Sequence, residues 1–457
     1  MTESVLPFTG SEPENLAPDG FPTGPFALIR RGDSPVVEVL TGQVVDVPTT
    51  GDIPLDGLAV LAVVPFRQIA ERGFEVVDDA APLRCLVATN RREVPVAEVL
   101  AVLPAPPTFQ ADGFDISDAQ YADQVREVIR EDIGRGEGAN FVLHRSFEGR
   151  VEASSREAVL AWMGALLRAE QGVYWTYAVF TDGLAFAGAS PERHLSIKSG
   201  VVTMNPISGT YHHPLQGASL EGMLHFLTDS KEVEELFMVV DEELKLMSAI
   251  CPSGGRVIGP YLKPMSRLTH TEYLLEGLTE ADPREILRRT MFAPTVTGAP
   301  MENACAVIAR RERRPRGYYA GVMALFEPGA GGVWDLDSPI MIRTAYVTPS
   351  GEVAVPAGAT LVRNSDPVSE VAETHAKAAA MLTAIGALGG SAAGGGAGAR
   401  GAVEAGALPP IGFSDPEPPG PNPAQIAADP QVKATLMYRN ERLAPFWLRP
   451  QASGPAP

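Results

Sequence analysis

The sequence predicts a mixed α/β protein, and three observations lead to that prediction. The chain has 457 residues, 45% of them hydrophobic and 20% charged, which is ample material for a globular core. Short apolar runs bounded by turn residues predict β-strands, first between Phe26 and Leu103 and again from residue 139 onward. Longer segments with apolar residues at helical spacing stand among them. At roughly 100–200 residues per domain, the length allows two or three domains, or one large domain with two lobes.

The first part of the chain is predicted to be rich in strands. Residues 1–24 combine Pro, Gly and acidic residues without a period, which is typical of a flexible arm. The runs FALIRR, VVEVL, LAVLAVVPF and LRCLVATN then predict strands, and LPAPPTF (103–109) marks a boundary. Ser117 is a good N-cap for the next helix, which Gly134, Gly136 and Gly138 end and whose apolar stripe is Tyr121, Val125, Val128 and Ile129.

Strands and helices alternate through the rest of the chain. ANFVLHRS (139–146) predicts a strand, Ser155 caps the next helix, and VYWTYAVF (173–180), LAFAG (184–188) and VVTMN (201–205) predict further strands. An amphipathic helix is predicted from Lys231 to Ile250, then a hairpin of residues 339–347 and 352–358, and a helix from Pro367 to about Ile385. Residues 389–423 are a Gly/Ala/Pro-rich linker, and residues 424–457 recover amphipathic character.

Composition excludes several classes of protein. A formal net charge of −19 argues against nucleic acid and anionic membrane as primary partners. The three cysteines, Cys85, Cys251 and Cys305, are far apart and form no CxxC, so neither a disulfide framework nor a zinc site is expected. The N-terminus lacks a basic, apolar leader, and no apolar run reaches the ~18–20 residues of a membrane span. A soluble, cytoplasmic protein is expected.

Two pairs of glutamates are the first candidate site. Glu232 and Glu235 lie three residues apart on one predicted helix, and Glu370 and Glu373 lie three apart on another, so each pair shares a helical face. Two convergent pairs would offer the oxygen ligands that Mg²⁺ prefers. Glutamate pairs at this spacing are also common on solvated helix faces, and spacing alone leaves that alternative open.

Single residues in short segments are the other candidates. The turn in GASPERH could direct Glu192 into a cleft as a general acid, or could be an ordinary capped turn. NPISGTY, APTVTGAP and VPAGATLV place small residues and hydroxyls on Gly-containing loops, where backbone N–H groups can hold a carboxylate. Arg343, inside the predicted strand IMIRTAY, suits a carboxylate partner. His270 could be a ligand, a proton carrier or a structural residue.

In order along the chain, these segments resemble the chorismate-utilising enzymes, which include anthranilate synthase large subunits, aminodeoxychorismate synthase, isochorismate and salicylate synthases, and the 2-amino-2-deoxyisochorismate synthases of phenazine and enediyne pathways. The resemblance runs from about Ser117 to Leu388, with a weaker N-terminal part, and rests on GASPERH, NPISGTY, DSKEVEELFMVVD, RLTHTEYLLEGL, TVTGAP, GYYAGVMALF, IMIRTAY, PAGATLV and SDPVSEVAETHAK. It implies a two-lobed sandwich whose large antiparallel sheets flank a deep cleft, with residues 25–108 as a β-rich part and 109–388 as the catalytic core.

The resemblance also implies roles for the candidate residues. Glu235 and Glu373 would hold Mg²⁺ with the substrate ring carboxylate, supported by Glu232 and Glu370, and Glu192 would protonate the departing 4-hydroxyl. Arg343 and Tyr319 would bind the enolpyruvyl carboxylate with the backbone of Gly358, Ala359 and Thr360. Thr210, His270, Thr297 and Lys377 would line the cleft.

Two positions bear on the nucleophile. Isochorismate and salicylate synthases have a Lys that activates water where this chain has Asn140, and aminodeoxychorismate synthase has a nucleophilic Lys where this chain has Ser208. Ammonia addition at C2 of chorismate is what remains. VDEELKLMSAIC (240–251) and VYWTYAVF depart from anthranilate synthase and are closer to the phenazine and enediyne type, so 2-amino-2-deoxyisochorismate is the expected product. Anthranilate is the alternative product, and isochorismate or salicylate formation is less favoured. A different hypothesis is that the chain is a chorismate-binding paralogue without catalytic activity.

The resemblance implies an ammonia donor as well. No Cys has the Gly-rich context of a glutaminase nucleophile, so ammonia would come from a separate glutamine amidotransferase or from free ammonium. Residues 424–448 resemble the segment that joins the two domains in phenazine-type fusions. Enzymes of this type often form homodimers, and the sequence leaves that state open. An antibiotic-type biosynthetic pathway is expected.

Overall fold

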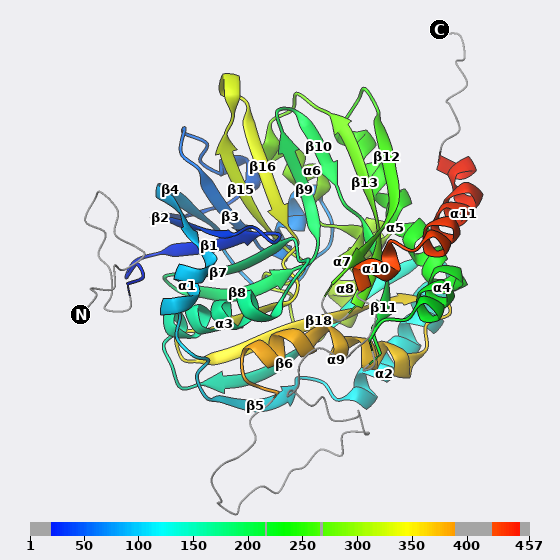
Figure 1. The fold of residues 1–457 in the computed structure, drawn as a ribbon, viewed down its shortest axis with the longest axis horizontal. Coiled ribbons are helices and arrows are strands. Elements are labelled where there is room, and N and C mark those ends of the chain that lie inside the picture. Colours follow the sequence, from blue (N-terminus) through cyan, green and yellow to red (C-terminus); the bar gives the residue numbers. More distant parts are fainter. Residues whose placement is uncertain (1–19, 215–216, 266–267, 389–422, 448–457) are drawn as a thin grey trace, which may run out of the picture.

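The structure is a computed structural model that describes residues 20–214, 217–265, 268–388 and 423–447. The chain there is a mixed α/β protein built on antiparallel sheet (Figure 1). The first strands are β1 (Phe26–Arg31), β2 (Val36–Val47), β3 (Val60–Val64), β4 (Leu83–Pro95), β5 (Phe109–Phe114), β6 (Asn140–Val151), β7 (Trp175–Thr181), β8 (Leu184–Ser190) and β9 (Arg193–Lys198). The others are β10 (Val201–Met204), β11 (Ile207–His212), β12 (Gly255–Pro264), β13 (Leu268–Leu278), β14 (Gly298–Ala299), β15 (Val322–Pro328), β16 (Trp334–Pro339), β17 (Thr344–Val347) and β18 (Glu352–Val362).

The helices pack around this sheet. They are α1 (Val96–Val102), α2 (Asp118–Glu127), α3 (Ser155–Ala169), α4 (Leu220–Thr228), α5 (Ser230–Ile250), α6 (Pro283–Thr290), α7 (Pro294–Thr297), α8 (Met301–Arg311), α9 (Pro367–Ala384), α10 (Pro423–Ala427) and α11 (Pro430–Trp447). A π-helical turn, Val128–Ile133, extends α2, and short 3₁₀ turns are η1 (Thr50–Asp52), η2 (Phe66–Arg72) and η4 (Ala330–Gly332). Within the described residues, no helix combines the length and apolar character that a membrane span requires.

The sheet divides into two arms that meet at β2. One arm runs through β4, β3, β15, β16, β9, β10 and β13 to β11 and β12, and the other runs through β1, β7, β8, β17 and β18 to β6, β5 and β14. Every one of these strand pairings is antiparallel. A core cluster joins the arms where Ile29 of β1 and Trp175 of β7 pack with Val63 of β3 and Met323 of β15. This is the two-lobed sandwich that the resemblance implied.

Helices cover the arms because their apolar faces match the sheet surfaces. Trp162 and Leu166 of α3 and Met381 of α9 belong to one cluster with residues of β8 and β18, so α3 and α9 bury one face of the second arm. Leu236, Val240 and Met247 of α5 share the largest cluster with the first arm. The two helices that carry the paired glutamates therefore belong to different lobes.

Most predicted elements are confirmed, with two corrections. Ser117 caps α2 in a capping box with Gln120, but the helix predicted to start at Ser155 is capped by Ser154, whose side chain accepts from the Glu157 N–H. Arg343 is not inside a strand: it stands just before β17 with a φ of 54°, in the left-handed region. All but the last residue of the predicted linker at 389–423, and most of the N-terminal arm, lie outside the described residues; Pro423 begins α10.

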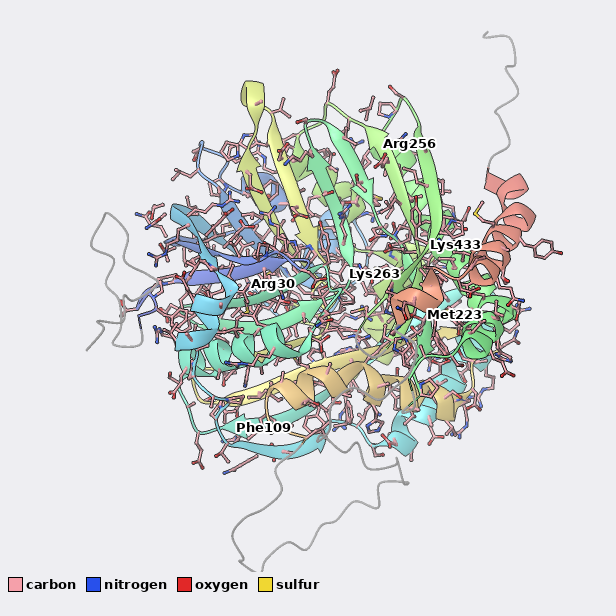
Figure 2. All side chains as sticks on the ribbon, viewed as in Figure 1. Arg30, Phe109, Met223, Arg256, Lys263 and Lys433 are labelled. Carbon is pink, nitrogen blue, oxygen red and sulfur yellow. The ribbon has the colours of Figure 1, made fainter. Side chains whose placement is uncertain are left out.

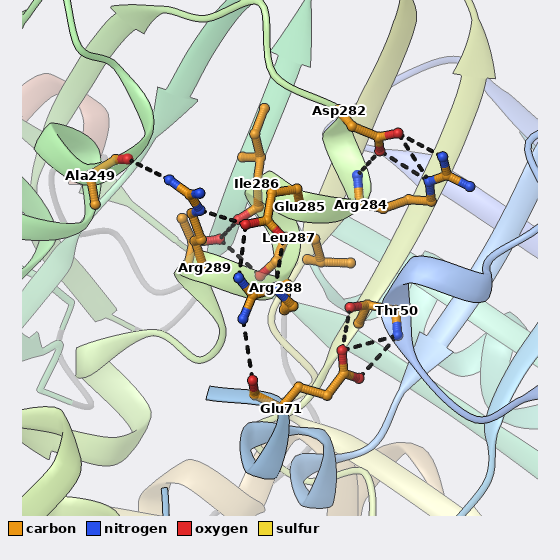
Figure 3. Close-up of polar contacts among 11 residues, drawn as sticks. Thr50, Glu71, Ala249, Asp282, Arg284, Glu285, Ile286, Leu287, Arg288 and Arg289 are labelled. Atoms are coloured by element: carbon orange, nitrogen blue, oxygen red, sulfur yellow. Dashed lines mark hydrogen bonds and ion pairs between the residues drawn. The ribbon is translucent and has the colours of Figure 1, made fainter. Parts of the chain in front are cut away.

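Helix α6 fixes the end of α5. Figure 3 shows Arg288 and Arg289 flanking Glu285, which binds both guanidinium groups at 2.7 and 2.6 Å. Arg289 donates to the Ala249 carbonyl oxygen in the last turn of α5 at 3.3 Å, and Arg288 donates to the carbonyl oxygen of Glu71 at 3.2 Å. These bonds satisfy carbonyl groups at element ends and link α5, through α6, to the 3₁₀ turn η2.

The C-terminal helices dock on α4, far from them in sequence. Ile426 of α10 and Val432 and Leu436 of α11 form a cluster with Met223, Phe226 and Leu227 of α4, and all six are buried. Figure 2 places Lys433 of α11 beside Met223 of α4 at one side of the molecule. The tail thus packs onto the segment that leads from β11 to α5.

Candidate active site

A cavity of about 770 Å³, partly open to solvent, lies between the lobes. It is lined from β11 and β13, from β18, from α7, from α5 and α9, and from the turns that carry Glu192 and Arg343. Nine residues that the sequence singled out line it together: Glu192, Thr210, His270, Tyr319, Arg343, Gly358, Thr360, Glu373 and Lys377. These residues span 185 positions of sequence from Glu192 to Lys377, so only the fold brings them together.

Glu192 is a buried carboxyl group in the turn between β8 and β9. The turn is fixed by the Ser190 hydroxyl, which donates to the carbonyl oxygen of Ile340 at 2.7 Å. Only 6% of Glu192 is exposed, and burial raises its pKa to about 7, although Thr295, Lys263, Lys377 and Arg343 oppose the rise. A carboxyl group with this pKa holds a proton near neutral pH and can give it to a leaving group.

The cavity wall carries two cations. Burial lowers the pKa of Arg343, and no carboxylate among the described residues lies within 4 Å of its guanidinium group; its Nη1 donates instead to the Lys377 carbonyl oxygen at 3.1 Å. Lys377 Nζ lies 2.6 Å from Glu373 Oε1 and donates to the Gly358 carbonyl oxygen at 3.0 Å. A guanidinium group with no carboxylate within 4 Å among the described residues is suited to an anionic ligand.

His270 is held as a neutral imidazole. It is 6% exposed, and its Nδ1 lies 2.9 Å from the Gly209 carbonyl oxygen, which can only accept, so Nδ1 carries the proton. Burial lowers the pKa of His270 to about 3, although the Gly209 bond opposes the change. Its Nε2 is therefore an unprotonated acceptor near neutral pH, and a pKa this low makes the ring a weak base.

Carboxylates approach the cavity from both lobes. Glu373 lines it directly from α9, and Glu370, one turn earlier, is fully buried. Glu232 Oε2 accepts from the backbone N–H of Thr210 at 3.2 Å. Gly209, at a φ of 75°, makes room for that carboxylate, because a Cβ there would lie 2.8 Å from Glu232 Oε2. Glu235 is on the same helix α5, but its side chain lies outside the described ones, as does that of Ser208.

Three predicted residues lie beside the cavity and do not line it. Asn140 is 1% exposed at the start of β6, and its Oδ1 has no hydrogen-bond partner among the described residues. The Thr297 hydroxyl is directed into α7, where it donates to the Ala293 carbonyl oxygen at 2.8 Å. Ala359 is fully buried, and its N–H donates to the Tyr121 hydroxyl at 3.3 Å, so it faces away from its neighbours Gly358 and Thr360.

Two further residues contact the site that sequence reasoning did not single out. Thr295, in the quoted segment APTVTGAP, lines the cavity beside Glu192. Lys263 of β12 donates from Nζ to the Pro191 carbonyl oxygen at 2.8 Å, which places its charge next to Glu192 at the centre of the molecule (Figure 2). The signal for Thr295 was the hydroxyl-rich segment itself, whereas no local pattern marks Lys263.

Comparison with known proteins gives a consistent result. Residues 78–383 match the family described as chorismate binding enzyme. The chain is 47% identical to "Anthranilate synthase, phenazine specific" of Pseudomonas chlororaphis, over 93% of this chain and 63% of that protein. It is also 47% identical to the protein of the same description from Pseudomonas fluorescens, over 79% of this chain and 58% of that one. The chain thus spans about three fifths of the length of these relatives.

The solved structures agree on the fold. Anthranilate synthase component I from Streptococcus pneumoniae superposes with a TM-score of 0.59 at 22% identity, over 82% of this chain and 95% of that one. The family match covers every residue that lines the cavity. The chain therefore belongs to the chorismate binding enzyme family.

Proposed function

We propose that the chain aminates chorismate at C2 with loss of the 4-hydroxyl group, giving 2-amino-2-deoxyisochorismate. The observation that carries the proposal is the buried Glu192 facing a cavity that also holds Arg343 and Lys377. An acid that keeps its proton near pH 7, in a cavity where the Arg343 guanidinium has no carboxylate within 4 Å among the described residues, suits the removal of hydroxide from a dianionic substrate.

In the proposed reaction the atoms balance without a further reagent. Ammonia forms a bond to C2, the ring double bonds shift, and the C4–O bond breaks. The oxygen leaves as water with the proton that Glu192 donates, and the new ammonium group returns a proton to the Glu192 carboxylate. Net, chorismate and ammonia give the amino product and water, and Glu192 is regenerated.

The enolpyruvyl carboxylate of the substrate is assigned to the cationic wall. Arg343 presents a planar guanidinium group that can bind a carboxylate through two parallel hydrogen bonds. Tyr319, 4% exposed, lines the same wall, and the Gly358–Thr360 segment of β18 adds backbone and hydroxyl groups. Holding both carboxylates fixes C4 near Glu192, which is how positioning contributes to the rate.

The proposal includes Mg²⁺. Glu373 lines the cavity, and Glu232, from the other lobe, accepts from the backbone N–H of Thr210, which also lines it; carboxylate oxygens are the ligand type that this cation prefers. Glu373 and Glu235 would hold the ion, with support from Glu232 and Glu370. When bound, Mg²⁺ would anchor the ring carboxylate and polarise the ring.

The choice of ammonia rather than water as the nucleophile rests on Asn140. An amide side chain cannot remove a proton from water, so the residue at the start of β6 offers no base for hydroxylation of C2. This favours ammonia, which is a nucleophile in its neutral form. The buried Asn140 Oδ1, without a partner among the described residues, is a free acceptor at this place.

The ammonia source is proposed to be a separate glutamine amidotransferase or free ammonium. A glutaminase needs an activated thiolate, and all three cysteines of the chain are buried. Burial raises the pKa of Cys85 and of Cys305 to about 12 and also raises that of Cys251, so none of them offers a thiolate near neutral pH.

One observation favours a second candidate product. The neutral His270 in the cavity has its Nε2 available as a base, and removal of the C2 proton would allow pyruvate to leave and anthranilate to form. The names of the two phenazine-specific relatives also include anthranilate synthase.

A product assay tests both candidates. The purified chain is incubated with chorismate, Mg²⁺ and ammonium, and the products are resolved by liquid chromatography and mass spectrometry. A non-fluorescent product with one nitrogen and the enolpyruvyl group retained supports the proposal. Fluorescent anthranilate with pyruvate identifies the second candidate, and chorismate binding without turnover overturns both. Isochorismate would contradict the argument from Asn140.

A further inference from the structure

The ribbon of β6 and β18 borders two spaces on one of its faces. One is the cavity, and the other is a larger groove beyond it. Val142 of β6 and Gly358 of β18 face the cavity, and His144 of β6 faces the groove one step along the same side of the sheet. Pro356 borders both spaces. The groove encloses about 1450 Å³, part of it open to solvent. His144 therefore stands at the partition between the two spaces.

His144 is bound on one side to a buried ion pair. Its Nδ1 lies 2.9 Å from Glu312 Oε2, and its backbone N–H donates to Glu312 Oε1 at 3.0 Å. Arg316 binds the same carboxylate at 2.7 Å and is anchored by donating to the carbonyl oxygens of Val142 and Val296, each at 2.7 Å. Burial by itself raises the pKa of Glu312, but Arg316 and His144 outweigh it and hold that pKa at about 2.

On its other side His144 lies against a residue of the cavity wall. The imidazole is stacked on the Tyr319 ring, with 5.0 Å between centroids and 27° between planes. The Arg316 guanidinium lies 5.5 Å from the centre of the same ring. Two members of the buried network thus lie against Tyr319, and the His144 ring forms the plane against which the phenol rests.

The phenol hydroxyl fills a space left by a glycine. A Cβ on Gly358 would lie 2.5 Å from the Tyr319 hydroxyl oxygen, so that oxygen sits directly over the Gly358 backbone. The Lys377 Nζ donates to the Gly358 carbonyl oxygen from the cavity side. A small rotation of the Tyr319 ring would move its hydroxyl out of this space and change the wall that faces Arg343.

We propose that His144 is a positioning residue, which holds Tyr319 in the orientation that binds a substrate carboxylate. The proposal rests on the proposed function, because it assigns Tyr319 to that carboxylate. His144 touches the Tyr319 ring from the side of the groove, whereas Gly358 and Arg343 face the cavity. A flat ring anchored by a carboxylate suits this place, since it offers both a stacking surface and a fixed angle.

A double-mutant cycle tests the proposal. The variants are His144→Ala, His144→Phe, Tyr319→Phe and the combination of His144→Ala with Tyr319→Phe, and the readouts are KM for chorismate and kcat. His144→Ala is expected to raise KM roughly tenfold and to lower kcat less than about threefold, because the ground-state contact is lost. In the Tyr319→Phe background the same change is expected to shift KM by less than about twofold. His144→Phe keeps a ring but loses Glu312, and an intermediate KM is expected.

The control is Ser146→Ala, which removes a groove-lining side chain from the next position on the same face of β6 and is expected to leave KM and kcat unchanged. An equal effect of His144→Ala in both backgrounds would overturn the proposal, as would a fall in kcat at constant KM. If His144→Ala does not fold, His144→Phe with and without Tyr319→Phe completes the cycle.

A ligand-free readout separates this inference from the proposed function. Tyrosine labelled with ¹³C at Cζ gives one resonance per phenol, and the Tyr319→Phe variant identifies the one from Tyr319. His144→Ala is expected to shift or broaden that resonance, whereas Ser146→Ala is not. If the parent chain neither binds nor consumes chorismate, the proposed function fails while this result still decides whether His144 fixes Tyr319.

Discussion

Glu373 and Lys377 form an ion pair of 2.6 Å one turn apart on α9, and both side chains line the cavity. The pairing has an effect on the pKa of Lys377. Burial by itself lowers the pKa of Lys377, but the Glu373 carboxylate outweighs burial and raises that pKa above its usual value. Lys377 therefore stays charged at the cavity wall, beside Glu373.

Glu373→Gln is expected to weaken the dependence on Mg²⁺. The amide keeps the size of the side chain but removes the charge that a hard cation requires. The concentration of Mg²⁺ at half-maximal turnover is expected to rise about tenfold or more, in line with the loss of a charged ligand. Titration of Mg²⁺ into chelator-treated protein measures it, with Glu302→Gln on the exposed surface of α8 as the matched control. An unchanged midpoint would remove Glu373 from the assignment.

Glu192→Gln is expected to abolish turnover while leaving chorismate binding within about threefold, because only the transferable proton is removed. General acids contribute typically 10²–10⁴-fold, so a loss of about that size in kcat is expected. Calorimetric binding and single-turnover rates separate the two effects. Retained turnover would exclude Glu192 as the acid.

The pH dependence of kcat/KM also tests whether Glu192 is the general acid, and the direction of the change is predicted. Glu192 donates only when protonated, and its pKa is about 7, so kcat/KM is expected to fall as the pH rises through that value. The profile is measured at a constant concentration of unprotonated ammonia. Otherwise the rise in unprotonated ammonia with pH would mask the expected fall in kcat/KM. A profile that rises through neutral pH under those conditions would contradict the role.

Glu243→Gln is expected to stabilise the protein above neutral pH. Glu243 of α5 is 3% exposed, its Oε2 has no partner among the described residues, and burial together with Glu192 raises its pKa well above 4.5. A raised folded-state pKa contributes stability below the unfolded value, which is lost as the pH rises toward the folded value. The parent should lose up to about 1.4 kcal/mol per pH unit there from this group, whereas the Gln variant should not.

Denaturant unfolding of both proteins between about pH 5 and pH 8 measures the difference, which should shrink toward the acid end. Glu98→Gln, an exposed glutamate on α1, is the matched control and should leave the pH dependence unchanged. A Glu243→Gln variant that is less stable than the parent at pH 8 would show that the carboxylate is favourable where it lies.

Gly358→Ala is expected to cost about 1–3 kcal/mol of folding free energy and to impair binding, because the added methyl group overpacks a filled site. Its Cβ would lie 2.5 Å from the Tyr319 hydroxyl and 2.9 Å from the Leu143 carbonyl oxygen. Denaturant unfolding and KM for chorismate are the measurements. Gly24→Ala, where a Cβ would meet nothing within 4 Å, is the control and should change neither.

The sequence predicted elements where a local pattern is sufficient. The strands in FALIRR and LRCLVATN and the capped start of α2 at Ser117 follow from apolar runs and a capping residue, and the structure confirms them. Arg343 was misplaced inside a strand because its apolar neighbours continue the period, while its left-handed backbone leaves no mark in the residue type. Ser154 and Ser155 are adjacent hydroxyl residues, and composition does not choose between them.

The site was predictable as a set of segments but not as a set of contacts. Thr295 and Thr297 lie on a helix of four residues, too short for a period to show that Thr295 faces the cavity and Thr297 does not. Lys263 and His144 owe their places to partners on other strands and helices. Glu312 is 168 positions from His144, and no pattern within a window of residues reports such a pair.

The docking of α10 and α11 on α4 has a practical consequence for anyone who handles shortened forms of the chain. A fragment that stops at Leu388 keeps every residue of the cavity, yet it uncovers Met223, Phe226 and Leu227, which the tail now shields from water. Freshly exposed apolar side chains of this kind promote self-association. The smallest well-behaved unit should therefore include the helices up to Trp447, although they contribute no group to the cavity.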